Sequence, residues 1–158
     1  MTLSSGLENV SQSGSVIYKK NADGGRVEKV TAGSGLFMTA IVTKYGQTAP
    51  TVALCANGEM VSGVIIGQFT PYTVDLTYDS DNTFTAAVSL QLYIPNRGDI
   101  LYGTTKTATA ITADTWVDVD GGFLTTGTRT AHIGKAIEAA AGASGTEYII
   151  LYEWDQGL

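Results

Sequence analysis

The chain has 158 residues, the length of one ordinary domain, and such a chain can bury about 68–70% of its unfolded surface without disulfides or metal. Fifteen acidic residues against nine basic ones give a net charge of −6, which argues against a nucleic-acid-binding surface, because such surfaces gather Lys and Arg on one face. A single cysteine, Cys55, excludes an internal disulfide, and a single histidine, His132, excludes a metal site built from several histidines.

The first residues and the hydropathy of the chain give no indication of membrane targeting. Residues 1–6 lack the basic segment followed by an apolar segment that marks a secretory signal. No uninterrupted apolar run reaches the length that spans a bilayer. We therefore expect neither a signal peptide nor a membrane partner.

Glycine and threonine dominate the composition. The chain holds 19 glycines and 22 threonines, and only 15% of its residues are charged. Threonine, valine and isoleucine suit the pleated surface of a sheet, and glycine supplies the turn positions that need a positive φ. The composition therefore predicts an all-β fold with many turns.

Residues 1–14 are predicted to form a flexible N-terminal arm, and residues 15–158 the single all-β domain. The arm is rich in Ser, Gly and Asn, and its apolar residues Leu3, Leu7 and Val10 are too sparse to bury a stable face. The arm is expected to gain order only when a partner covers these side chains.

Turn dipeptides and alternating apolar residues predict the strands that follow. Asp23-Gly24-Gly25 marks a first turn, and residues 35–44, apolar on both faces, predict a central strand. Asn57-Gly58 predicts a hairpin that joins residues 51–56 to residues 59–69. A second hairpin is predicted between residues 73–78 and 85–94, on either side of a polar turn.

The C-terminal third continues the pattern. Asp120-Gly121-Gly122 marks another turn, and alternating apolar residues predict a strand over residues 147–154. Alanines favour a helix of a turn or two over residues 133–143, limited by Gly134 and Gly142. The pattern as a whole predicts about nine to twelve strands, in a β-sandwich or a partly open β-barrel with at most one short helix.

No residue pattern indicates catalysis or a metal site. Cys55 and His132 form the only Cys/His pair in the chain, and Cys55 lies in an apolar run where an inert, packed thiol is expected. The acidic groups Asp79/Asp81 and Asp114/Asp118/Asp120 could offer oxygens to calcium, but neither is followed by the bidentate Glu of an EF-hand loop. We predict no catalytic residue, no metal and no cofactor.

Two further features have both a functional and a structural interpretation. Arg97-Gly98-Asp99 spells a tripeptide that integrins recognise, yet after Pro95-Asn96 the same residues are ordinary turn chemistry, which is the interpretation we favour. Scattered Tyr and Trp residues could line a sugar-binding groove, with Trp116 and Trp154 as its anchors. These residues are spread over all the predicted strands, however, so we expect most of them in the core or in an interface.

Two segments carry a resemblance to a known family. Residues 132–142 read His-Ile-Gly-Lys-Ala-Ile-Glu-Ala-Ala-Ala-Gly and are followed by the apolar strand Tyr148-Ile149-Ile150-Leu151-Tyr152. This order resembles the C-terminal signature of small capsid decoration proteins of tailed double-stranded DNA viruses. Residues 97–102, Arg-Gly-Asp-Ile-Leu-Tyr, are similar to an earlier strand entry in that family. The resemblance covers about a third of the chain.

The resemblance implies a non-enzymatic structural protein of the virion, made in the host cytoplasm and bound to the outer capsid surface. It implies a homotrimer that stabilises the capsid as a cement protein, with the major capsid protein as its partner. The arm, with Leu3, Leu7 and Val10, would then become ordered on that partner by strand addition. A carbohydrate-binding or adhesin-like module remains the alternative, and a small hydrolase is a third possibility supported only by isolated carboxylates.

Overall fold

The computed structural model describes residues 2–3, 16–21, 25–46, 48–68, 80–81 and 83–155. This part of the chain contains strands and turns but no helix, which confirms the all-β prediction. It also contains no helix long and apolar enough to cross a membrane. The strands are β1 (Thr2–Leu3), β2 (Ile17–Lys19), β3 (Arg26–Ala32), β4 (Ile41–Tyr45), β5 (Thr51–Leu54), β6 (Gly63–Gln68), β7 (Ser89–Ile94), β8 (Ile100–Thr104), β9 (Trp116–Asp120), β10 (Phe123–Thr126), β11 (Gly134–Ala136), β12 (Thr146–Glu147) and β13 (Ile149–Trp154).

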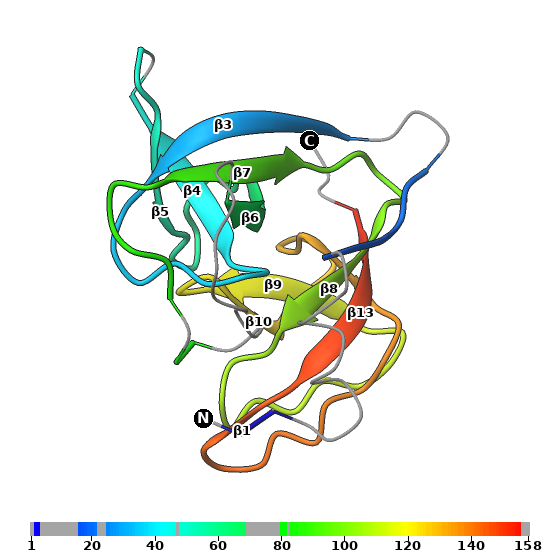
Figure 1. Cartoon of the computed structure of the whole chain (residues 1–158). Coiled ribbons are helices and arrows are strands. Elements are labelled where there is room, and N and C mark those ends of the chain that lie inside the picture. The colour runs from blue at the N-terminus through cyan, green and yellow to red at the C-terminus, as the bar shows by residue number, and fades with distance from the viewer. Residues whose placement is uncertain are drawn as a thin grey trace.

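Five strands form a closed barrel in the order β3-β5-β4-β6-β7 (Figure 1). Its longest pairing joins β3 to β7, from Arg26 opposite Ile94 to Thr31 opposite Ser89. β3 and β5 pair in parallel, and the other neighbours pair antiparallel. Glu28 shares a face of β3 with the buried Val30 and pairs there with Lys44 of β4 at 2.8 Å, which lowers the pKa of its carboxyl.

Six strands form a second sheet in the order β10-β9-β11-β13-β8-β2, below the barrel in Figure 1. The predicted turn at Asp120-Gly121-Gly122 is confirmed as the link between β9 and β10, and both glycines have the positive φ, 60° and 84°, that a tight hairpin turn requires. Thr105, just after β8, bridges Leu124 of β10, so β10 at one end of the sheet approaches β8, the strand next to the other end. β1 and β12 form a separate parallel pair.

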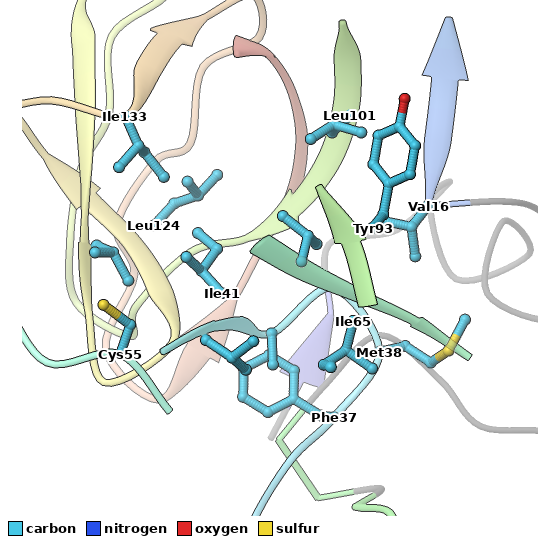
Figure 2. Close-up of a cluster of buried hydrophobic side chains, with 14 of the residues drawn as sticks. Val16, Phe37, Met38, Ile41, Cys55, Ile65, Tyr93, Leu101, Leu124 and Ile133 are labelled. Carbon is cyan, nitrogen blue, oxygen red and sulfur yellow. The ribbon is translucent and has the colours of Figure 1, made fainter. Parts of the chain in front are cut away.

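The barrel and the second sheet share one hydrophobic core. The ring of Phe37, from the β3–β4 connection, stacks on Phe123 of β10 with centroids 4.8 Å apart. The Ile41 amide donates to the Gly122 carbonyl at 3.0 Å, and the Gly122 amide donates to the Cys55 carbonyl at 3.0 Å. Figure 2 shows buried side chains of both sheets, among them Ile41 and Leu124, filling the space between them.

The hairpin predicted at Asn57-Gly58 is wrong. The turn itself exists, with φ 86° at Gly58 and a hydrogen bond from the Glu59 amide to the Ala56 carbonyl. However, β5 and β6 are not neighbours, because β4 lies between them and pairs with both. A turn dipeptide sets local backbone geometry, whereas barrel closure decides which strands pair.

Two predicted strands are shorter than the sequence pattern indicated. The strand predicted over residues 35–44 begins only at Ile41, because Thr39 has a φ of 77°. The strand predicted over residues 85–94 begins at Ser89, because Ala87 has a φ of 69°. Its predicted partner, residues 73–78, lies outside the described residues, as does most of the turn predicted at Asp23-Gly24-Gly25.

The short helix predicted over residues 133–143 is also wrong. Residues 134–136 form β11, which lies between β9 and β13. A side chain on Gly134 would come within 2.3 Å of the Glu153 carbonyl oxygen, so only glycine permits this close strand approach. Pairing inside a sheet here overrides the helix propensity of the alanines. The strand predicted over residues 147–154 is confirmed, interrupted only at Tyr148 between β12 and β13.

Candidate functional site: the N-terminal strand and its docking edge

The first residues of the predicted arm lie against the last part of the domain. Thr2 pairs with Thr146 and Leu3 with Glu147, so that β1 adds a short parallel strand to β12. Leu7 and Val10, the other two predicted contact residues, lie outside the described residues. The domain thus has a strand edge at β12 that accepts an N-terminal strand.

Contacts that do not involve β1 hold this edge in place. Glu147 is fully buried, and Ser80 donates to its carboxylate from the hydroxyl at 2.6 Å and from the amide at 3.1 Å. The Thr105 amide donates to the Tyr148 carbonyl at 2.8 Å, and the Tyr148 amide donates to Thr105 Oγ1 at 3.0 Å. Because these bonds fix β12 from its other side, its edge is preorganised for strand addition.

The Asp99 side chain organises the turn between β7 and β8. It is fully buried and accepts three hydrogen bonds, from the backbone amide of Asn21 at 2.7 Å, the Tyr93 hydroxyl at 2.7 Å and the backbone amide of Asn96 at 2.9 Å. Gly98, with φ 91°, makes the turn possible. Since a receptor could not reach this buried carboxylate, Arg97-Gly98-Asp99 is a structural turn, as favoured from the sequence.

Tyr93 links this turn to the connection between β2 and β3. Its hydroxyl donates to Asp99 and accepts a hydrogen bond from the Gly25 amide at 2.8 Å. Burial and the bond to Asp99 raise the pKa of Tyr93 to about 12. The phenol is therefore a neutral donor at physiological pH, as its role toward the carboxylate requires.

Cys55 and His132 make separate sets of contacts. The Cys55 thiol is buried and faces the carbonyls of Ala56 and Glu59, at 3.5 and 3.8 Å. The His132 ring stacks on Trp116 with centroids 4.1 Å apart, and its Nδ1 lies 3.0 Å from the Thr128 carbonyl. These contacts describe two packed side chains rather than a nucleophile and its base.

The Cys55 thiol is expected to resist alkylation in the folded protein. Burial, reinforced by the charges of Glu59 and Asp118, raises the pKa of Cys55 to about 11, so very little thiolate is present near pH 7. Iodoacetamide labelling followed by mass spectrometry should show almost no adduct in the native protein and complete modification after unfolding. Equally fast labelling of both states would contradict the buried position.

The acidic turns are engaged in internal contacts. Asp120 pairs with Lys106, and the Asn57 side-chain amide donates to Asp118 at 3.4 Å. In the described part of the chain no three His, Cys, Asp or Glu side chains gather as a metal site would need. Asp79 lies outside the described residues.

The tryptophans proposed as sugar anchors are also engaged. Trp154 is buried in the core. The ring of Trp116 contacts His132, and Lys135 Nζ lies 5.7 Å from the ring centroid. Stacking on a sugar needs an open aromatic face, which Trp154 does not have. The structure thus gives no specific support to the carbohydrate-binding alternative.

Sequence reasoning missed the two buried carboxylates. From the sequence, Glu147 is only the first residue of the predicted C-terminal strand, and Asp99 is only part of a turn. Acidic residues are seldom fully buried, so their burial is set by distant partners such as Ser80 and Asn21 that no local pattern reveals. For Asp99, the neighbouring Asn-Arg-Gly turn was the only available signal.

No family model matches the chain, and no curated protein matches it. Among solved structures, the chain is similar to the N base of the head fiber protein gp8.5 of bacteriophage phi29. The TM-score is 0.54 at 9% sequence identity, and the match covers 83% of this chain and 94% of the other. At this identity the likeness is one of fold, and it extends over nearly the whole of that N-base chain.

Proposed function

We propose that the chain is a structural protein of a tailed-virus particle that binds the outer surface of the assembled capsid and stabilises it, without enzymatic activity or cofactor. The observation that carries this proposal is the fold likeness to a phage head fiber base over 94% of that chain. The C-terminal resemblance to capsid decoration proteins points, independently of the fold, to the same location on the particle.

Stabilisation would follow from mass action. A protein that binds only the assembled shell lowers the free energy of that shell by the free energy of each contact, and a capsid repeats the contact at many sites. A mildly acidic exterior suits this position, since it does not adsorb DNA. In this proposal the chain acts as a homotrimer whose partner is the major capsid protein.

The N-terminal arm is the proposed contact with the shell. Its apolar residues Leu3, Leu7 and Val10 would become buried against the major capsid protein, and extended arms commonly bind by adding a strand to an exposed edge. The pairing of β1 with β12 supports this proposal, because it demonstrates that the beginning of the arm adopts a strand conformation.

Deletion of residues 1–14 is expected to abolish binding to the heads of the parent virus. The same deletion should leave the thermal unfolding of the isolated domain nearly unchanged, because β1 contributes only two residue pairs to the fold. Co-sedimentation with purified heads and thermal denaturation measure the two effects.

Substitutions inside the arm provide the matched comparison. Leu3→Ser/Leu7→Ser/Val10→Ser should reproduce the loss of head binding, whereas Ser4→Ala/Ser5→Ala should bind as the unmodified chain does. Head binding by the deleted chain at full strength would disprove the role of the arm.

A further inference from the structure

The N-terminal arm is tied to the domain at both of its ends. At one end, β1, at the foot of Figure 1, pairs with β12, so that Leu3 lies opposite Glu147. At the other end, Val16 is fully buried, and its carbonyl accepts a hydrogen bond from the Tyr102 amide at 2.8 Å. Residues 4–15 connect the two ends, so the arm of the free chain is tethered on both sides.

The two ties differ greatly in strength. Val16 belongs to the hydrophobic core and leads into β2, which pairs with β8. β1 contributes only two residue pairs, in a parallel arrangement that is slightly less stable per residue than an antiparallel one. Two-stranded pairs of this size are marginal in water, and chain ends are among the first parts of a fold to open. The tie at β1 therefore opens while the tie at Val16 holds.

The edge of β12 does not depend on β1 for its position. The hydroxyl of Ser80 donates to the buried Glu147 carboxylate at 2.6 Å. The amide of Tyr148, the next residue, donates to Thr105 Oγ1 at 3.0 Å. Both contacts remain when β1 leaves. β1 can therefore open and close on a fixed edge, without unfolding of the strand that receives it.

Opening of this pairing changes how far the arm reaches. Once β1 is free, the twelve residues 4–15 extend to at most about 40 Å from Val16. With both ends tied, the same residues must run out and back, so they reach at most about half that distance. Only the released state carries Leu3 away from the domain to a partner surface.

We infer that the pairing of β1 with β12 is a latch that restrains the arm in the free chain, and that the arm binds the shell only after β1 has left β12. The inference rests on the proposed function and describes the regulation of its contact with the capsid. The two states compete because the same residue, Leu3, is held opposite Glu147 in one state and buried against the major capsid protein in the other.

The shell opens the latch by offering the arm more contacts than β12 does. β12 pairs with two arm residues, whereas the proposed shell contact buries Leu3, Leu7 and Val10. The latch lowers the apparent affinity for heads, because only the fraction of chains whose arm is free can bind. It also keeps a short strand and a receptive edge covered in free chains, and unpaired strand edges are templates for association with other chains.

A reversible disulfide between β1 and β12 tests the latch. Thr2 and Thr146 are Cα partners in neighbouring strands, which lie about 4.8 Å apart, within the range of about 4.4–6.8 Å that a disulfide spans. The native Cys55 is buried and does not compete for the introduced thiols. Mild oxidation of Thr2→Cys/Thr146→Cys should therefore give a disulfide within one chain, identified by peptide mapping and on a non-reducing gel.

The oxidised variant should co-sediment with heads no better than the chain that lacks residues 1–14. Reduction of the same sample should restore binding, because it frees the arm without any other change. Lys135→Cys/Glu153→Cys is the matched control, since these exposed residues are Cα partners in β11 and β13 and their disulfide leaves the arm free. The control should bind heads equally in its oxidised and reduced forms.

Hydrogen exchange of the unmodified chain provides a readout without substitutions. Release of β1 uncovers the edge of β12, so the backbone amides of residues 146–147 should exchange faster when the chain is bound to heads than when it is free. The amides of residues 117–119, in β9 between β10 and β11, should exchange at the same rate in both states.

The latch is overturned if the oxidised variant binds heads as well as the reduced one, since β1 would then meet the shell while still on β12. It is also overturned if no disulfide forms, if the disulfide joins two copies, or if reduction does not restore binding. Equal loss of binding in the oxidised control, or unchanged exchange of β12 on the heads, has the same consequence.

The same samples separate the latch from the proposed function. Equal head binding by the oxidised and reduced variants keeps the proposed function and removes only the latch. Absence of head binding by the unmodified chain removes the proposed function and, with it, the latch as a regulator of shell binding, even where the disulfide confirms that β1 lies on β12.

Discussion

Replacement of Asp99 by alanine is expected to lower the free energy of unfolding by about 3 kcal/mol or more. The substitution removes the shared acceptor of the buried Tyr93 hydroxyl and of the backbone amides of Asn21 and Asn96, two residues that are themselves exposed. A buried donor left without a partner costs about 1–3 kcal/mol, and a hydrogen bond to a charged group contributes about 1.5–3 kcal/mol. Urea denaturation of the two proteins measures the difference.

Substitutions at two neighbouring residues show whether the loss of stability comes from removal of the Asp99 carboxylate itself. Tyr93→Phe removes one donor to Asp99 and the acceptor of the Gly25 amide, and should cost about half as much as Asp99→Ala. Arg97→Ala removes an ion pair between the exposed Arg97 and the partly buried Asp155 and should cost about 1 kcal/mol. A loss for Asp99→Ala no larger than that for Arg97→Ala would contradict the network.

Replacement of Phe37 by alanine is expected to destabilise the protein by about 3–5 kcal/mol. Phe37 is 1% exposed and belongs to the loop between β3 and β4, while its stacking partner Phe123 belongs to β10. The substitution opens a cavity where the barrel packs against the second sheet, and the buried backbone there has little freedom to collapse into it.

The control for Phe37→Ala is the same kind of substitution at an exposed apolar residue, Met60. Met60→Ala should change the free energy of unfolding by less than about 0.5 kcal/mol, because its side chain is exposed. Thermal denaturation followed by far-UV and near-UV circular dichroism measures both variants. A small loss for Phe37→Ala would contradict a core shared by both sheets.

Several local features of this fold could be predicted from the sequence, whereas the pairing of its strands could not. The Asp120-Gly121-Gly122 turn and the C-terminal strand depend on adjacent residues, and both predictions are confirmed. The hairpin at Asn57-Gly58 failed because β4 separates β5 from β6, an outcome of barrel closure over distant segments. Thr39 and Ala87 each have a positive φ just before a strand begins, and neither residue type favours that conformation. The amino-acid types at these positions therefore could not indicate where the two strands begin.

At the candidate site, too, the local pattern could be interpreted from the sequence, whereas the contacts between distant residues could not. Sparse apolar residues in a polar segment predict the arm, which stays a prediction, and of its three apolar residues the structure places only Leu3, in β1. The edge that receives it could not be predicted, because it depends on Ser80 reaching Glu147 and on Thr105 reaching Tyr148 across the fold.

The most direct test of the account is co-sedimentation of the full chain with purified, DNA-filled heads of the parent virus from which the chain itself has been removed. The account predicts saturable binding at a fixed number of copies per capsid subunit, with heads that resist heat better once the sites are filled. Absence of binding, or binding without any gain in head stability, would contradict the proposal that this protein is a stabilising component of the outer capsid surface.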